Sequence, residues 1–241
     1  MTEYRERRGR SGVLWRVRPS PATTLDGRPP AAVPPAGEAV HRVLPDAAMD
    51  LMWHRGRLVV AGPDTAAQVG EPRPGEATWG LRLAPGTAHA LLGVPARELA
   101  DRRVDLADLV RLPPLPRTAD PAATLERAFA ALWRRADPDR SALRLAASLD
   151  RAARTRATAD AIAREHGMSA RTLRRTCDRV FGYGPKTLMS VHRFQRALRL
   201  ARSGTPLGEA AALAGYADQA HFTREAGRLA GLPPGRLLDG G

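Results

Sequence analysis

The chain has 241 residues, a formal net charge of +13 at pH 7 and a single cysteine. This length can form one large domain or two small ones with buried cores, and we favour two. One cysteine excludes an internal disulfide, and no apolar run approaches the roughly 18 residues that a membrane span needs. We therefore expect a cytoplasmic protein with no signal peptide and no membrane partner.

The positive charge is concentrated in the second half. Residues 1–117 carry 17 basic and 13 acidic side chains, whereas residues 118–241 carry 21 and 12. Many cations on one surface gain free energy when they release the counterions that surround phosphates. A compositional bias is an alternative source of the charge, since alanine is abundant and Lys186 is the only lysine. The distribution favours a polyanionic partner for the second half.

The first half is predicted to be rich in β-strands. Residues 1–12 form a polar, basic stretch that we expect to be a disordered tail, and the prolines from 19 to 35 also indicate poor order. From residue 13 to about residue 83 the apolar segments have the length of strands, and "MWHRGRLVV" predicts a hairpin around His54, Arg55 and Gly56. We assign residues 13–112 to a β-rich sensor or dimerisation domain and residues 113–140 to a linker and connecting helix.

Beyond Pro121 the apolar residues follow helical spacing, beginning with Leu125, Phe129 and Leu132. Ser169 and Asp218 are expected to be N-caps. Residues 141–241 are therefore predicted to be an all-α domain, with a long connecting helix in its middle. The helices are expected at residues 159–166, 170–180, 185–202, 207–214 and 219–230.

Two stretches of this helical region repeat one pattern. Ala163 and Gly167 correspond to Ala211 and Gly215 at an offset of 48, and five further positions correspond at an offset of 49. Those five pairs are Ser169 with Asp218, Leu173 with Phe222, Arg175 with Arg224, Gly182 with Gly231, and Pro185 with Pro234. A small residue, a glycine turn, an N-cap and an apolar anchor in this order are typical of a helix-turn-helix. The sequence therefore predicts two such units in tandem.

The second helix of each unit should present its polar face to DNA. Arginine and glutamine at the start of an exposed helix suit bidentate contacts with guanine and adenine. An alternative is that two helical hairpins pack in a bundle with solvated arginines, but the tandem register and the basic excess favour DNA. The predicted DNA-binding residues are Ser169, Ala170, Arg171, Arg174, Arg175, Lys186, Gln219, Ala220, His221, Thr223 and Arg224.

Residues 143–238 resemble the DNA-binding domain of the AraC/XylS family of bacterial transcription regulators. The resemblance lies in "IAREHGMSARTLRR", in the connector "GPKTLMSVHRFQRALRLA" and in "AALAGYADQAHFTREAGRLAGLPPGRL". It implies double-stranded promoter DNA as a partner, and RNA polymerase if the protein is an activator. The family usually has an aromatic residue where Cys177 and Ala226 stand, and Ser or Thr where Gly184 and Pro233 stand.

The first half is similar to the β-rich sensor domain found in an actinobacterial-type branch of that family. The similar segments are "LPDAAMDLMW", "VAGPDT" and "LLGVPARELADRRVDLADL", although Ala47 and Ala48 stand where Gly-Cys is expected. This resemblance implies an α+β chain with a cupin-like N-terminal domain that binds a small-molecule effector or forms a homodimer. The candidate effector-binding residues are Asp46, Asp50, Trp53 and Asp64, with solvated or turn-capping aspartates and a core tryptophan as the alternative.

Three readings compete with that of an effector-controlled, sequence-specific regulator. A non-specific architectural DNA-binding protein would use its N-terminal domain for oligomerisation alone. A cupin-like metalloenzyme would need clustered ligands, and the spacing of His41, His54 and His89 offers none. Cys177 as an alkyl acceptor would need an activated thiolate, whereas its place on the buried side of a helix favours the core. We expect no catalytic residues, no metal and no cofactor.

Overall fold

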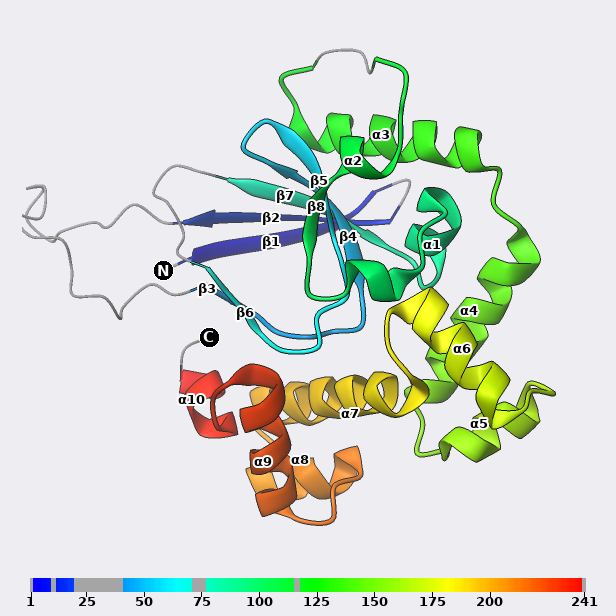
Figure 1. Ribbon diagram of the computed structural model, residues 1–241. Helices are drawn as coiled ribbons and strands as arrows, with labels where there is room; N and C mark the ends of the chain where they lie inside the picture. The colour runs from blue at the N-terminus through cyan, green and yellow to red at the C-terminus, as the bar shows by residue number, and fades with distance from the viewer. Residues whose placement is uncertain (1, 10–11, 20–40, 71–76, 115–117, 240–241) are drawn as a thin grey trace, which may run out of the picture.

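The computed structural model describes residues 2–9, 12–19, 41–70, 77–114 and 118–239. It has an α+β fold in which an N-terminal antiparallel sheet is followed by a C-terminal region of helices (Figure 1). None of the helices in these ranges is long and apolar enough to cross a membrane. The expected disorder of residues 20–35 falls outside the described part of the chain.

The main sheet has six strands in the order β1-β2-β7-β4-β5-β8, and all neighbours are antiparallel. A separate two-stranded sheet pairs β3 with β6. The cupin-like shape of the N-terminal domain stays a prediction. The strands are β1 (Thr2–Arg8), β2 (Val13–Pro19), β3 (His41–Val43), β4 (Met49–His54), β5 (Arg57–Ala61), β6 (Gln68–Gly70), β7 (Thr78–Leu83) and β8 (Arg103–Asp105).

The hairpin predicted around His54 is confirmed between β4 and β5. Its register pairs His54 with Arg57, so Arg55 and Gly56 form the two-residue turn. Both have positive φ angles, 50° and 77°. A two-residue turn of this kind matches the twist of the flanking strands, and glycine adopts such angles without steric cost.

The expectation of a disordered tail at residues 1–12 is wrong for residues 2–8. They form β1, which pairs with β2 along its whole length, from Thr2 opposite Pro19 to Arg8 opposite Val13. Charged residues dominate "TEYRERR", and such a composition is typical of a solvated tail. An edge strand tolerates such residues because one of its sides faces solvent, where charges also discourage pairing with another chain.

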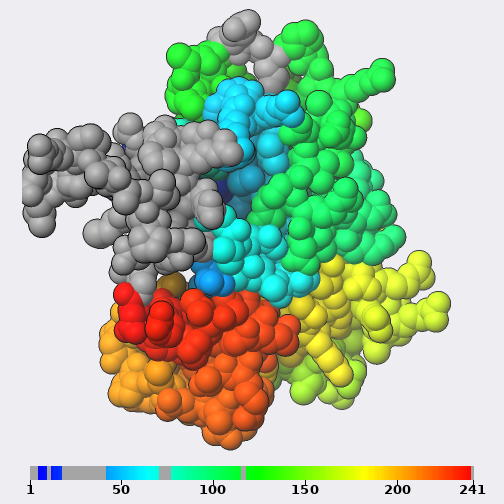
Figure 2. Space-filling model, turned by 60° about the vertical axis from the view of Figure 1, so that its left-hand side comes forward, coloured from blue at the N-terminus to red at the C-terminus, as the bar shows by residue number. Residues whose placement is uncertain are grey.

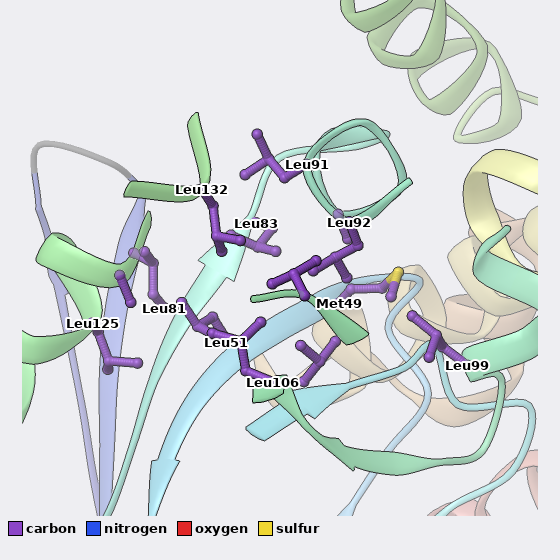
Figure 3. Packing of buried hydrophobic residues seen from close by; sticks show 14 of the residues in the cluster. Met49, Leu51, Leu81, Leu83, Leu91, Leu92, Leu99, Leu106, Leu125 and Leu132 are labelled. Atoms are coloured by element: carbon purple, nitrogen blue, oxygen red, sulfur yellow. The ribbon is translucent and has the colours of Figure 1, made fainter. Parts of the chain in front are cut away.

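The N-terminal core lies between the main sheet and helices α1 (Thr87–Leu92), α2 (Leu106–Leu109) and α3 (Pro121–Ala136), with the short helix η1 (Ala96–Leu99) at its border. Leucines of the strands meet leucines of the helices there (Figure 3). Leu51 of β4 and Leu81 of β7 are buried together with Leu125 and Leu132 of α3. This packing corrects the assignment of residues 113–140 as linker and connecting helix, because α3 is part of the N-terminal domain.

The C-terminal region contains the five predicted helices, together with one helix before them and one after them. They are α4 (Arg140–Ala153), α5 (Ala159–Glu165), α6 (Ala170–Phe181), α7 (Pro185–Arg202), α8 (Leu207–Ala214), α9 (Gln219–Ala230) and α10 (Pro234–Asp239). Helix α7 spans the region, with α4, α5 and α6 towards one end and α8, α9 and α10 towards the other (Figure 1). It contributes Leu188 to the core of the first group and Val191, Phe194 and Leu198 to the core of the second.

The N-terminal domain touches both groups of helices. Gln195 of α7 donates to the carbonyl oxygen of Pro45 at 2.6 Å, and the backbone N–H of Ala67 donates to the carbonyl oxygen of Leu229 at 2.7 Å. At the end of α6, a Cβ on Gly182 would lie 2.5 Å from the ring of Pro63. In Figure 2 the blue and cyan atoms of the N-terminal domain rest directly on the orange and red C-terminal helices.

Candidate nucleic-acid interface

Two helical pairs form the candidate interface. We call α5 with α6 the first unit and α8 with α9 the second unit. The turns contain Gly167 and Gly215, whose φ angles of 61° and 100° favour glycine. Ala163 and Ala211, which precede these turns, are buried. Small side chains at these positions let the two helices of each unit approach closely, as the repeat predicts.

The starts of α6 and α9 are fixed by side-chain caps. Ser169 Oγ accepts a hydrogen bond from the N–H of Thr172 at 3.1 Å, and Asp218 Oδ1 accepts one from the N–H of His221 at 2.6 Å. Each bond satisfies a donor that has no partner within its helix. The anchors Leu173 and Phe222 are buried, so each helix is held with its polar side outward.

Helix α6 presents four exposed guanidinium groups, three of them on the predicted DNA-binding residues. Arg174 lies 3.8 Å from Asp178 in a weak surface pair. Arg171 and Arg175 have no hydrogen bond or ion pair within the described residues. Ser169 and Ala170 at the helix start are exposed as well, and so is Lys186 in the first turn of α7. A donor that is bonded to water alone can replace that water by an acceptor on a partner at little cost in free energy.

Helix α9 presents a smaller polar surface. Gln219, Ala220 and Arg224 are exposed, and Arg224 has no partner within the described residues. Thr223 is half-buried, and its hydroxyl donates to the carbonyl oxygen of Gln219 at 2.9 Å. The imidazole of His221 lies edge-on to the ring of Tyr216, with centroids 5.1 Å apart. The structure therefore presents the predicted residues of each unit on or at the start of one helix, except for Lys186, which lies on α7.

A hub at Glu225 fixes α9 to α7, and no local sequence pattern predicts it. The carboxylate accepts hydrogen bonds from Ser190 at 2.8 Å, Arg193 at 2.8 Å and Tyr216 at 2.9 Å. Burial and the adjacent carboxylate raise the pKa of Tyr216, which keeps the phenol protonated as a donor. Charge-assisted bonds of this kind hold α9 in one orientation.

A second connection, also missed by the sequence, ties α4 to α7. His192 Nε2 lies 2.8 Å from Asp150 Oδ1 in a buried pair, and Arg154 donates to the other oxygen of that carboxylate at 2.9 Å. Burial acts to raise the pKa of Asp150, but the hydrogen bonds from His192 and Arg154 outweigh it and lower the pKa. Asp150 is therefore ionised at neutral pH, and α4, which packs in the core of the first unit, is fastened to the same helix as α9.

Cys177 lies in the core of the first unit. The side chain is buried, and burial raises the pKa of its thiol to about 12. A thiol with this pKa is protonated at neutral pH, whereas an alkyl acceptor needs a thiolate. The geometry favours the packing role that the sequence analysis preferred.

The four candidate effector-binding residues are divided by the structure. Asp46 and Asp50 both face the guanidinium of Arg82, and Trp15 Nε1 donates to Asp50 at 2.8 Å. Burial is the largest influence on Asp50 and raises the pKa of its carboxyl group to about 6. Trp53 packs against the N-terminal core, and Asp64 is held by two bonds from Arg103 at 2.8 and 2.9 Å. The structure brings together Asp46 and Asp50 alone.

A cleft of about 260 Å³ lies between the sheet and the helices beside this pair. Asp46 and Arg82 line one wall, and Asp150, His192 and Arg199 line the other. No cluster of three or more His, Cys, Asp or Glu residues suited to a metal ion occurs in the described ranges. Two of the three N-terminal histidines have other contacts there, since His54 bonds to Thr78 Oγ1 and His89 to the carbonyl oxygen of Val94.

Comparison with known families identifies the helical region. Residues 162–240 match a family model described as a helix-turn-helix domain. The C-terminal region is a helix-turn-helix domain. The match agrees with the AraC/XylS resemblance of the sequence motifs. In the first half, residues 30–105 match a family model described as a domain of unknown function, DUF6597.

Solved structures of ToxT from Vibrio cholerae resemble most of the chain weakly. A 1.65 Å structure has 10% identity and a TM-score of 0.44, and the alignment covers 84% of this chain and 90% of ToxT. ToxT bound to (E)-4-(8-methylnaphthalen-1-yl)but-3-enoic acid has 10% identity and a TM-score of 0.47, with coverage of 84% and 97%. ToxT bound to an unsaturated fatty acid has 11% identity and a TM-score of 0.43, with coverage of 83% and 87%. No curated protein sequence matches the chain.

Proposed function

We propose that this protein is a sequence-specific transcription regulator of the AraC/XylS type, in which α6 and α9 read adjacent major-groove segments of one DNA duplex. One observation carries the proposal. The two units of the helix-turn-helix domain place equivalent arginines, Arg175 and Arg224, on exposed helix faces without partners among the described residues. Exposed arginines near the start of such a helix suit contacts with guanine.

The attachment of both halves of the domain to α7 supports recognition of one DNA duplex by a rigid domain. Asp150 and His192 hold α4, which shares a core with the first unit, to α7, and Glu225 holds the second unit to the same helix. A base-reading protein needs such rigidity because bidentate contacts depend on geometry, whereas an architectural protein needs charge alone. A regulator also requires no catalytic group, and we propose no enzymatic activity.

A competition experiment separates the regulator from the architectural alternative. A preferred site is first selected from a random-sequence duplex pool, and its affinity is then measured against bulk DNA at one fixed salt concentration. A sequence-specific regulator should prefer the selected site by roughly 10³-fold or more. Enrichment of no site, with equal affinity for all duplexes, would contradict the proposal and favour the architectural alternative.

We propose in addition that a small polar effector controls the protein from the cleft beside Asp46. The cleft lies between the sheet of the N-terminal domain and helices α4 and α7, so a ligand there would contact both domains. A compound that raises the melting temperature of the wild type but not of an Ala84→Trp variant, whose indole would obstruct the cleft, would support this site. An equal rise in both would place binding elsewhere. A homodimer, and RNA polymerase as a partner of an activator, belong to the same proposal.

A further inference from the structure

A second cleft, of about 490 Å³, lies between the segment that joins α4 to α5, helix α7 and the second unit. Residues 153–157, which precede α5, form part of its wall on the side of the first unit. The end of α8 and the turn from Gly215 to Ala217 form the wall on the side of the second unit, and α7 contributes residues between them. The ionisable residues that line it are Arg154, Arg156, Arg193, Arg196, Tyr216 and His221, and none of its lining residues is acidic.

Two of the four arginines have no carboxylate partner within the described residues, so their positive charge is not compensated. Arg154 is neutralised by Asp150 at 2.9 Å, and Arg193 by Glu225 at 2.8 Å. Arg156 donates to the carbonyl oxygens of Ala212 and Leu213 at 2.8 and 2.9 Å, which are neutral acceptors at the end of α8. Arg196 is exposed and has no hydrogen bond or ion pair in the described part of the chain. The cleft therefore carries an excess of cations.

The position of the cleft relates it to the DNA backbone. In a helix-turn-helix unit the first helix crosses the backbone, and the start of the second helix enters the major groove. One wall of the cleft comes immediately before α5, the first helix of its unit. The other wall includes His221, in the first turn of α9 and two residues beyond Gln219. One wall thus adjoins the start of α5, and the other belongs to the second unit beside the start of α9, the two places at which the proposed binding mode brings the duplex near.

We propose that this cleft holds backbone phosphates of the DNA segment between the two half-elements, with Arg196 as the principal cation and Arg156 and His221 as further donors. The inference rests on the proposed function, because it requires both units to engage one duplex. Phosphate contacts of this kind fix the position of a protein on DNA and carry no base information. Arg196 should therefore contribute to the affinity for every sequence, in contrast to Arg175 and Arg224.

The salt dependence of binding tests this contact in the full-length chain. Losing one phosphate contact lowers the slope of log K against log salt by about 0.9, which corresponds to about eightfold in affinity at 0.1 M salt. We expect this change for Arg196→Ala, equally on the selected site and on bulk DNA. Arg196→Lys should keep the slope. Arg135→Ala, which removes an exposed arginine of α3 outside the cleft, should bind like the wild type.

A second experiment replaces selected phosphates of the DNA by uncharged methylphosphonates. Methylphosphonates placed between the two half-elements should weaken binding of the wild type, and should weaken binding of Arg196→Ala less, because the contact is already lost. An unchanged slope in Arg196→Ala, or full additivity of the two changes, would overturn the inference. If the wild type prefers a selected site while Arg196→Ala behaves like it, the inference alone fails. If the wild type prefers no site, the proposed function itself fails.

Discussion

Arg42 of β3 donates a hydrogen bond of 2.7 Å from Nη1 to the carbonyl oxygen of Ala230, the last residue of α9. The N–H of Ala67 donates to the preceding carbonyl oxygen, that of Leu229. The last carbonyl oxygens of a helix have no N–H donor within the helix. The N-terminal domain therefore supplies hydrogen-bond donors to the end of α9. The opposite end of the same helix is the one that we propose contacts DNA.

We predict that Arg42→Ala loosens the end of α9. Loss of a hydrogen bond from a charged donor should lower the free energy of unfolding by about 1.5–3 kcal/mol. Hydrogen exchange should become faster in the last turn of α9, while α6 should keep its protection. Arg135→Ala is the matched control. Unchanged exchange in α9 would show that the bond contributes nothing to that end of the helix.

Replacing Arg175 or Arg224 should reduce specific binding. Each side chain is exposed without a partner in the described structure, so its removal should leave the fold intact. We expect Arg175→Ala and Arg224→Ala each to cost about 1–3 kcal/mol on the selected site, with a smaller loss on bulk DNA. The measurement is a titration at fixed salt. Wild-type affinity in both variants would remove these residues from the proposed base contacts.

The helical region was predictable from the sequence because local signals specified it. The N-caps Ser169 and Asp218, the turn glycines and the apolar stripe of α7 each act within a few residues, and the structure agrees with all of them. The hub at Glu225 was missed, because Ser190 and Arg193 lie 35 and 32 residues away from it. Side-chain contacts at such separations depend on tertiary packing, which local patterns do not contain.

The same limit explains the misplaced domain boundary and the misassigned tail. The stripe of Leu125, Ala128 and Leu132 indicates a helix with a buried face, but it does not say which core buries it. Strand β1 likewise depends on pairing with β2, and its charged residues resemble those of a solvated segment. The candidate effector-binding residues do not form one site. Trp53 and Asp50 lie on the same strand, but Trp53 packs against the N-terminal core and Asp50 accepts a hydrogen bond from Trp15.

Moving the domain boundary leads to a prediction about fragments. A fragment of residues 138–241 should fold as a helical monomer, because it contains the cores around α7 and the N-cap of α4, where Asp139 accepts from the N–H of Ser141 at 2.7 Å. A fragment of residues 122–241 should instead expose the apolar face of α3 and self-associate. Circular dichroism and sedimentation measure both properties. A monomeric longer fragment beside an unfolded shorter one would contradict this boundary.

The carboxyl group of Asp50 should make the stability depend on pH. Burial raises its pKa to about 6 in the folded chain from the ordinary value of 3.8. The folded state then binds the proton more tightly than the unfolded state, so the stabilisation is complete below about pH 4 and is lost as the pH rises through 6. The loss amounts to about 3 kcal/mol. Asp50→Asn should lack this loss in urea unfolding curves between pH 4 and 7, and parallel curves for both proteins would exclude the effect.

The spacing between the two half-elements should be fixed by α7. Its 18 residues correspond to a length of about 27 Å at 1.5 Å per residue. Leu188 and Phe194, which face the cores of the two units, hold it in place. Successive major-groove segments on one face of DNA lie about 34 Å apart, or roughly 10 base pairs. Because α7 is rigid, it cannot bring the second recognition helix to a half-element that lies on the opposite face of the duplex.

Inserting about 5 base pairs between the half-elements of a footprinted site makes that turn, since a helical repeat is roughly 10 base pairs. We expect the inserted site to lose the contribution of one unit, so that Arg224→Ala or Arg175→Ala, but not both, no longer affects the affinity. Footprinting should show protection over one half-element. Undiminished binding to the inserted site would mean that the two units do not read DNA together, and the repeat of Gly167 and Gly215 would then serve packing alone.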